Sequence, residues 1–99
     1  MNHLPATIPF TERQTRVIAA MVKVLPAGTW LSRESIDKIA AASNGPDIIR
    51  QIRHVTGHDG VLMERREVTD KDGKTVRAGQ YQLTEAGYQR LIKAGFKSE

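Results

Sequence analysis

Apolar residues recur at helical spacing in the first quarter of the chain. Val17, Met21 and Val24 follow one another at intervals of four and three residues, which predicts a helix with one buried side. Thr11 precedes this stripe and Gln14 follows three positions later, an order typical of a capping box. We therefore expect a helix that begins at residue 11 or 12 and ends near residue 25, where a proline and a glycine follow.

Two shorter helices, joined by a tight polar turn, are predicted between residues 32 and 56. Ser32 can cap the first of them, because its side-chain oxygen can accept from a backbone N–H of the opening turn. Asn44 and Gly45 are expected to break that helix as residues that tolerate positive φ. Pro46 then suits the first turn of the next helix, where its missing N–H is harmless.

The helix predicted over residues 46–56 has two different sides. At 100° per residue, Ile48, Ile52 and Val55 form an apolar stripe, with Ile49 on its flank. The remaining side chains are polar or charged: Asp47, Arg50 and His54 opposite the stripe, Arg53 at the edge and Gln51 closer to the stripe. Many surface helices have a polar side, so this pattern alone leaves the function open.

The pattern changes after residue 60 to one typical of a β-hairpin. Residues 61–69 and 75–83 are rich in β-branched and aromatic side chains, and they flank a glycine-containing polar loop at 70–74. On the second strand Tyr81 and Leu83 share one face. On the first strand two sets compete for the inner face, Val61 with Met63 and Leu62 with Val68.

Two further elements are expected outside these regions. Residues 29–31 could add a brief edge strand to the sheet, and their Trp30 is expected to anchor the core, with ligand stacking as the alternative. Thr84 is expected to cap a last helix that ends at Gly95. The apolar side of that helix carries Tyr88, Leu91 and Ile92, and Phe96 can fold back on the body.

Length and composition are those of one globular domain. With 99 residues, 39% of them apolar and 26% charged, the chain can form a single core. We expect a loose arm over residues 1–10, the domain over 11–96 and a short tail over 97–99. The chain lacks cysteine, an apolar run of membrane-spanning length and a signal-peptide pattern, which favours a cytoplasmic protein. The net charge of +4 favours an anionic partner.

Motifs for catalysis or metal binding are weak. His54 and His58 have the spacing of a metal pair, but Gly57 is expected to end the helix between them and a third ligand is not evident. Residues 70–75 imitate fragments of a calcium loop and of a phosphate loop without the remaining ligands or the following helix. We therefore predict a protein that is not an enzyme and has no metal, cofactor or small-molecule effector.

The order of elements resembles that of the winged helix-turn-helix superfamily of DNA-binding domains, an α+β fold. The resemblance covers residues 11–96, and its clearest motif is the exit from the hairpin, Tyr81-Gln82-Leu83-Thr84-Glu85-Ala86-Gly87. It is similar to the Tyr-x-Leu-Thr-x-x-Gly segment that closes the wing in many bacterial and phage regulators. The resemblance implies a three-helix core, a hairpin wing and a C-terminal helix.

The same resemblance implies binding of double-stranded DNA by a small prokaryotic or phage transcriptional regulator. The helix over residues 46–56 would enter the major groove, and the loop over 70–74 would reach the adjacent minor groove or backbone. The expected base-reading residues are Arg50, Gln51, Arg53 and His54. The expected backbone contacts are Arg33, Ser43, Asn44, Arg65, Arg66, Lys71, Lys74 and Arg77. The acidic Asp47 and the alternating charges of the hairpin loop depart from a uniformly cationic surface.

An alternative hypothesis is a winged helix that binds protein instead of DNA, as an adaptor or inhibitor. Its contact surface would be the hairpin or the last helix. The residues expected there are Tyr88, Leu91, Ile92 and Phe96. The same surface could instead join two copies in a homodimer, which would let the protein span two DNA half-sites.

Overall fold

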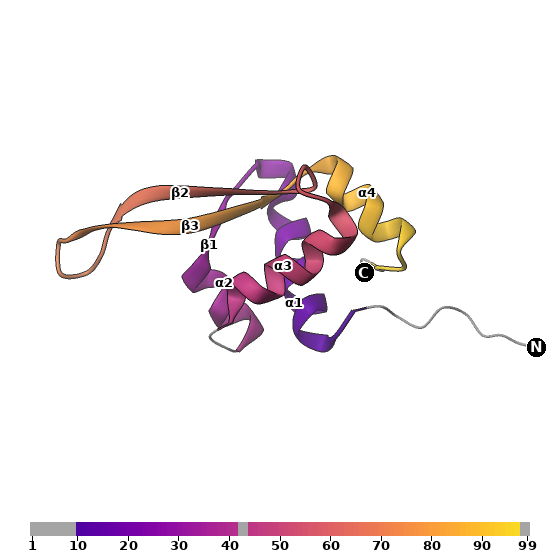
Figure 1. The fold of residues 1–99 in the computed structure, drawn as a ribbon, viewed down its shortest axis with the longest axis horizontal. Coiled ribbons are helices and arrows are strands. Elements are labelled where there is room, and N and C mark those ends of the chain that lie inside the picture. The colour runs from indigo at the N-terminus through magenta and orange to yellow at the C-terminus, as the bar shows by residue number, and fades with distance from the viewer. Residues whose placement is uncertain (1–9, 42–43, 98–99) are drawn as a thin grey trace, which may run out of the picture.

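The computed structural model describes residues 10–41 and 44–97 of the chain. Within these ranges the protein has an α+β fold with four α-helices, a short 3-10 helix and a three-stranded antiparallel sheet. Figure 1 shows how the α-helices and strands are arranged. The elements in chain order are α1 (Glu12–Val24), η1 (Leu25–Ala27), β1 (Leu31–Ser32), α2 (Arg33–Ala40), α3 (Gly45–Thr56), β2 (Val61–Thr69), β3 (Thr75–Leu83) and α4 (Glu85–Lys93). Residues 1–9 of the expected arm, Ser43 and the end of the tail lie outside the described ranges.

Three of the helices begin at the predicted caps. Thr11 accepts from the backbone N–H of Gln14, whose side chain accepts in return from the N–H of Thr11, so the capping box is complete. Ser32 accepts from the N–H of Ser35, and Thr84 accepts from that of Gly87. Each bond satisfies a backbone donor that the helix itself leaves unpaired.

The end of α2 differs from the prediction. The residue with positive φ is Ala41 at +56°, whereas Asn44 has φ of −118°. Gly45 is required for a different reason: a Cβ atom there would collide with the carboxylate of Asp37 and the side chain of Ile36. The Asp37 carboxylate accepts from the N–H of Gly45 at 2.7 Å, which ties the start of α3 to α2.

The sheet has the order β1-β3-β2, and its register resolves the competition on the first strand. Val61 pairs with Leu83 and Met63 pairs with Tyr81, so these four side chains share the face toward the helices. Directly paired residues of an antiparallel ladder lie on the same face. β1 contributes only two residues, Leu31 opposite Tyr81 and Ser32 opposite Gln80.

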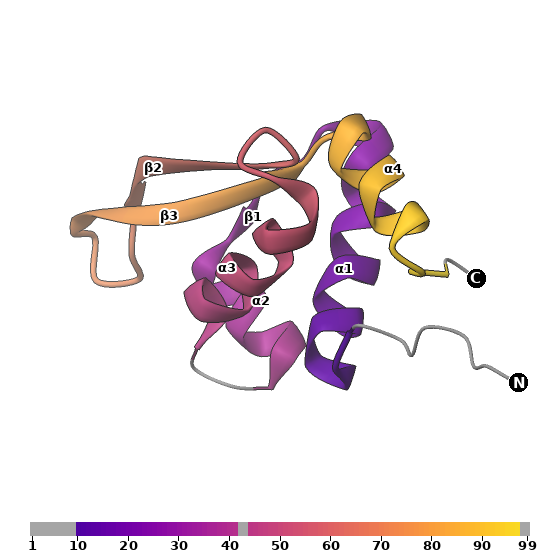
Figure 2. The same cartoon turned by 45° about the vertical axis from the view of Figure 1, so that its right-hand side comes forward.

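Most of the hairpin therefore projects beyond the body. Past the pair Glu64–Gln80 the two strands have only each other as ladder partners among the described residues. Figure 2 shows the free end extending well away from the helices, and the longest dimension of the molecule is 60 Å against 25 and 22 Å.

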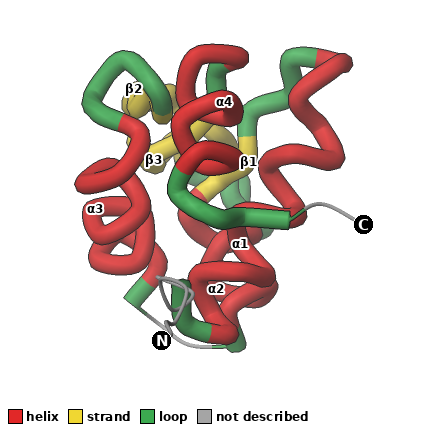
Figure 3. The backbone as a smooth tube through the Cα atoms, turned by 90° about the vertical axis from the view of Figure 1, so that its right-hand side faces the viewer, coloured by secondary structure: helices red, strands yellow, loops and turns green. Residues whose placement is uncertain are grey.

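The core lies between the helices and the attached end of the hairpin, where α1, α2 and α4 surround the inner side of α3 (Figure 3). Buried side chains come from every α-helix, among them Val17, Ile36, Ile52 and Leu91. Phe10 joins its edge: its ring meets that of Phe96 edge-on, with 6.4 Å between the centroids. In the described residues, no helix combines the length and apolar character needed to cross a bilayer.

Two expectations about large side chains need correction. Leu91 and Phe96 were expected at a protein interface. Leu91 is fully buried and Phe96 is 6% exposed, so neither is available there. Tyr88 packs partly against the core, which leaves Ile92, 39% exposed, as the most accessible of the four. Trp30 is half-buried and is not a core anchor: the guanidinium of Arg66 stacks over its ring at 4.7 Å.

Candidate nucleic-acid interface

The outer side of α3 is the exposed polar surface that its sequence predicts. Ile48, Ile49 and Ile52 are buried in the core, with exposures of 3% or less. Arg50 and His54, one turn apart, are both exposed on the opposite side. The isoleucine contacts fix the helix, and its polar side faces solvent.

One carboxylate organises the middle of this surface. Oδ1 of Asp47 accepts from Nε of Arg50 at 3.0 Å and from Nη2 at 2.6 Å, while Nη1 of Arg50 lies 3.4 Å from Nε2 of His54. Oδ2 of Asp47 accepts from Nε2 of Gln51 at 3.0 Å. Gln51 accepts in turn from the side-chain amide of Gln14 on α1. Gln51 is thus half-buried and held on both sides of its amide, unlike the free base-reading side chain we expected.

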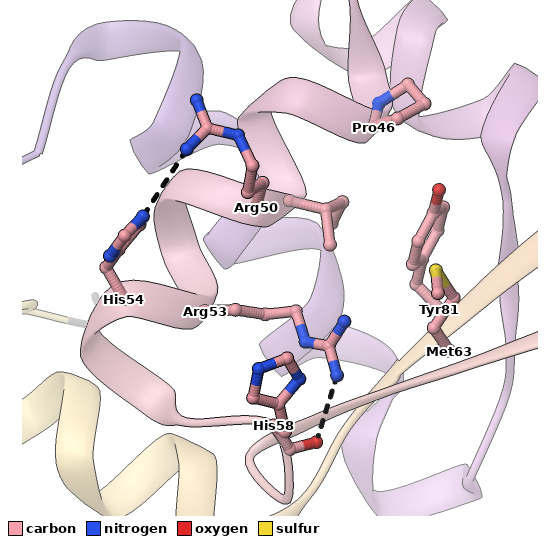
Figure 4. Close-up of a pocket in the computed structure, with 8 residues that line it drawn as sticks. Pro46, Arg50, Arg53, His54, His58, Met63 and Tyr81 are labelled. Atoms are coloured by element: carbon pink, nitrogen blue, oxygen red, sulfur yellow. Dashed lines mark hydrogen bonds between the residues drawn. The ribbon is translucent and has the colours of Figure 1, made fainter.

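A groove of about 500 Å³ separates α3 from the hairpin (Figure 4). Its eight lining residues combine apolar or aromatic side chains with arginines and histidines: Pro46, Ile49, Met63, Tyr81, Arg50, Arg53, His54 and His58. Burial raises the pKa of the Tyr81 hydroxyl above its ordinary value of 10.0, so this wall of the groove stays uncharged well beyond neutral pH. The groove can therefore take an anion beside an apolar wall.

Arg53 lies inside this groove. Its Nη2 donates to the backbone oxygen of His58 at 3.3 Å, and its buried Nε has no hydrogen-bond partner in the described structure. Figure 4 shows Arg53 and His58 side by side between α3 and the hairpin. The position suits contact with an anion that enters the groove better than contact with a base edge in front of α3.

His54 and His58 do not share a helix, because α3 ends at Thr56 and Gly57 follows with φ of +79°. Among the described side chains, no three of the types His, Asp and Glu gather where they could hold a metal ion.

The cations of the hairpin divide between its two faces. Arg65 and Arg77 share the parity of Met63 and Tyr81 in the register, so they extend the groove-side face toward the free end. Arg66 lies on the other face, where Nε donates to Glu64 at 2.7 Å and the guanidinium covers Trp30. The structure therefore separates Arg66 from the groove-side cations with which it was grouped.

The loop at the free end contains an acid with a structural task. Oδ1 of Asp70 accepts from the backbone N–H groups of Asp72 at 3.0 Å and Lys74 at 2.9 Å. These bonds shape the loop and leave the side chains of Lys71 and Lys74 exposed. The alternating charges of residues 70–74 therefore come in part from Asp70, which forms the turn, and from the two exposed lysines.

The remaining predicted contacts flank the start of α3. Asn44 is exposed, and its backbone oxygen accepts from the N–H groups of Asp47 and Ile48. Arg33 is exposed in the first turn of α2, with Nε 3.8 Å from Oδ2 of Asp37. Both lie near the N-terminal end of α3, whose partial positive charge also favours anions.

A network at the other end of α3 fixes its direction. Nη1 of Arg90 on α4 donates to the backbone oxygen of Thr56 at 2.6 Å and to Asp59 at 2.7 Å, and Nη2 donates to Asp59 at 3.1 Å. The side-chain hydrogen bond from Arg90 holds the pKa of Asp59 below its ordinary value of 3.8. α4 thereby secures the C-terminal end of α3.

Neither the protein-family models nor the curated proteins gave a match to this sequence. The geometry therefore carries the functional argument. Sequence reasoning missed the role of Asp47 as an acceptor for Arg50 and Gln51, although spacings of three and four residues on one helix signal such pairs. It also missed the contribution of Met63 and Tyr81 to the groove, which depends on the hairpin register.

Proposed function

We propose that this protein is a winged-helix protein that binds double-stranded DNA. α3 would enter the major groove, whose width of about 12 Å accommodates a helix. β2 and β3 would form the wing along the flanking backbone, and the role implied by the sequence resemblance is regulation of transcription. The four α-helices and the antiparallel hairpin are compatible with this fold.

The observation that carries the proposal is one face of basic side chains, which α3, the turn after it and the hairpin build together. α3 contributes exposed Arg50 and His54, the groove contributes Arg53 and His58, and the hairpin continues the same side with Arg65 and Arg77. With α3 in the major groove of the DNA, the DNA backbone that borders this major groove would run along the protein groove between α3 and the hairpin. Its phosphates would meet the guanidinium of Arg53, which lines the groove.

The alternative of a protein-binding module loses two of the four residues expected at its α4 surface. Leu91 and Phe96 belong to the core, so the outer side of α4 offers only Ile92 and part of Tyr88 as apolar contacts. A stable protein interface needs a larger buried patch around aromatic or aliphatic anchors. The charges and shape of the α3 surface support DNA as the partner.

Fluorescence anisotropy with a labelled random-sequence duplex tests the proposal. We expect an affinity that falls linearly with salt on a double-logarithmic plot, because neutralised phosphates release counterions. Arg53→Ala with Arg65→Ala should weaken binding and flatten the slope by about two units, one for each lost phosphate contact. Lys23→Ala, which removes an exposed cation at the end of α1, should leave the slope unchanged. A wild-type protein without salt-dependent affinity for duplex would refute the proposal.

A further inference from the structure

The guanidinium of Arg50 is held along one edge by Asp47, and His54 contacts its Nη1 atom. Arginine has one N–H at Nε and two at each of Nη1 and Nη2. Asp47 accepts from Nε and Nη2, so the carboxylate occupies the side of the fork nearer the main chain. The second N–H of Nη2 and the N–H groups of Nη1 remain directed toward the tip. His54 approaches Nη1 at 3.4 Å and limits its sideways movement.

The carboxylate is itself held in place from behind. Its second oxygen accepts from Gln51, and Gln51 accepts from Gln14 on α1. The chain of contacts runs from the core side of α1 to the exposed tip of Arg50. As a stabilising ion pair this would matter little, since the side chains of Arg50 and Asp47 are 63% and 45% exposed and such pairs contribute about 0–1 kcal/mol. The main effect of the Asp47–Arg50 pair is to orient the guanidinium of Arg50.

We infer that Asp47 positions Arg50 to read a guanine, an inference that rests on the proposed binding of duplex DNA. The free tip of Arg50 offers two roughly parallel N–H donors. In the major groove the base that presents two adjacent acceptors is guanine, through O6 and N7. A guanidinium held by Asp47 pays less conformational entropy when it forms this pair than a free one would.

The negative charge of Asp47 has a second effect. The Asp47–Arg50 pair has no net charge, so it attracts phosphates weakly. The pair therefore contributes little to the affinity for DNA of arbitrary sequence. A guanine is recognised through two directed bonds that the pair leaves available. Asp47 thus lowers the affinity for all duplexes while it raises the preference for those with guanine under Arg50.

The test uses the full-length protein. The DNA is a duplex that the protein has selected from a random-sequence library. Each guanine of the selected site is replaced in turn by 7-deazaguanine, which lacks the N7 acceptor, or by inosine, which keeps O6 and N7 and loses only the minor-groove amino group. At one guanine we expect the 7-deaza replacement to weaken wild-type binding roughly tenfold to a hundredfold. Inosine at the same position should have a much smaller effect.

Variants of Asp47 and Arg50 separate positioning from charge. Arg50→Ala should abolish the 7-deaza penalty at that guanine. Asp47→Ala should bind random duplex more tightly and show a severalfold smaller penalty, whereas Asp47→Asn, which keeps one acceptor oxygen, should bind random duplex more tightly and retain more of the penalty. Circular dichroism verifies that each variant is folded.

The outcomes are distinct. An Asp47→Ala protein that binds every duplex more tightly by one common factor, with its 7-deaza penalty intact, would show that Asp47 only repels phosphate and would overturn the inference. So would a wild-type protein that binds duplex with a normal salt slope but tolerates 7-deazaguanine at every guanine. Absence of any salt-dependent duplex binding would instead refute the proposed function, and the inference with it.

Discussion

Two glycines bring the start of α4 against the turn that follows α3. A Cβ atom on Gly87 would overlap the backbone of Gly60, and a Cβ atom on Gly60 would overlap that of Thr56. The close approach lets Thr84 donate from its N–H to the oxygen of Gly60 at 2.9 Å and from its hydroxyl to that of Asp59 at 2.9 Å. The glycine of the hairpin-exit motif is therefore required by contact between two backbones.

Gly87→Ala should destabilise the protein by roughly 1–3 kcal/mol, because backbone atoms of Gly60 must move to admit the new methyl group. In a helix free of such contact the same change would stabilise by about 1 kcal/mol through helix propensity. Gln89→Ala, an exposed position on the same helix, should change stability by less than about 0.5 kcal/mol. Urea denaturation measures both, and a Gly87→Ala protein more stable than wild type would refute the argument.

At the scale of elements, the connection between α3 and α4 has a pH-dependent part. The pKa of Asp59 is lowered by its hydrogen bond from Arg90, so the folded state holds the ionised form more strongly than the unfolded chain does. The resulting stabilisation is fully present above the unfolded pKa of about 3.8 and is lost as pH falls through the lower folded pKa. Its loss would leave Arg90 with the backbone oxygen of Thr56 as its remaining partner between the two helices in the described structure.

We therefore expect Asp59→Asn to be less stable than wild type at pH 6 and to approach wild-type stability as the pH falls below 4. The measurement is the free energy of unfolding from urea titrations between pH 2.5 and 7, taken as the difference between the two proteins. In an Arg90→Gln background the same difference should be small at every pH, because the donor is gone. A difference that is independent of pH would contradict the assigned role of the pair.

The elements that could be predicted from sequence are those fixed by neighbouring residues. The caps at Thr11, Ser32 and Thr84 act within three positions, and the apolar stripe of α3 depends only on spacing. The return of Phe96 to the body was also expected from its place after Gly95, and its burial confirms it. The stacking of Arg66 on Trp30 depends on a contact between segments far apart in sequence, which local patterns do not encode.

The site follows the same division. The exposed side of α3 was predictable, and so was the presence of cations on the hairpin. Their distribution was not, because it follows from the register that places Arg65 beside the groove and Arg66 over Trp30. The engagement of Gln51 by Gln14 depends on the packing of α1 against α3, which no periodicity predicts.

At the scale of the whole molecule, the unusual feature is the length of the hairpin. Nine residues in each strand correspond to about 30 Å of extended chain, and only the attached end packs on the core. A two-stranded hairpin without further contacts is marginally stable. Removal of its free end should therefore affect the body little, which allows the DNA-binding contribution of the hairpin to be measured by itself.

The register offers a deletion that leaves the net charge unchanged. Arg66 pairs with Ala78, so a two-residue Asn-Gly turn can replace residues 67–77 and keep the remaining ladder. The deleted segment contains three acids, Glu67, Asp70 and Asp72, and three bases, Lys71, Lys74 and Arg77, so the formal charge stays at +4. Any loss of DNA affinity then comes from lost contacts and not from a change in overall charge.

We expect the free energy of unfolding of the shortened protein to lie within about 1 kcal/mol of the wild-type value, because the core contacts of Val61, Tyr81 and Leu83 remain. Its affinity for random duplex should fall, and its salt slope should flatten by about one to three units, depending on how many of the three deleted bases contact phosphates. The full-length triple substitution of Lys71, Lys74 and Arg77 by alanine should flatten the slope equally. Equal slopes for shortened and wild-type proteins would show that DNA is held by the body alone and that the hairpin projects for another purpose.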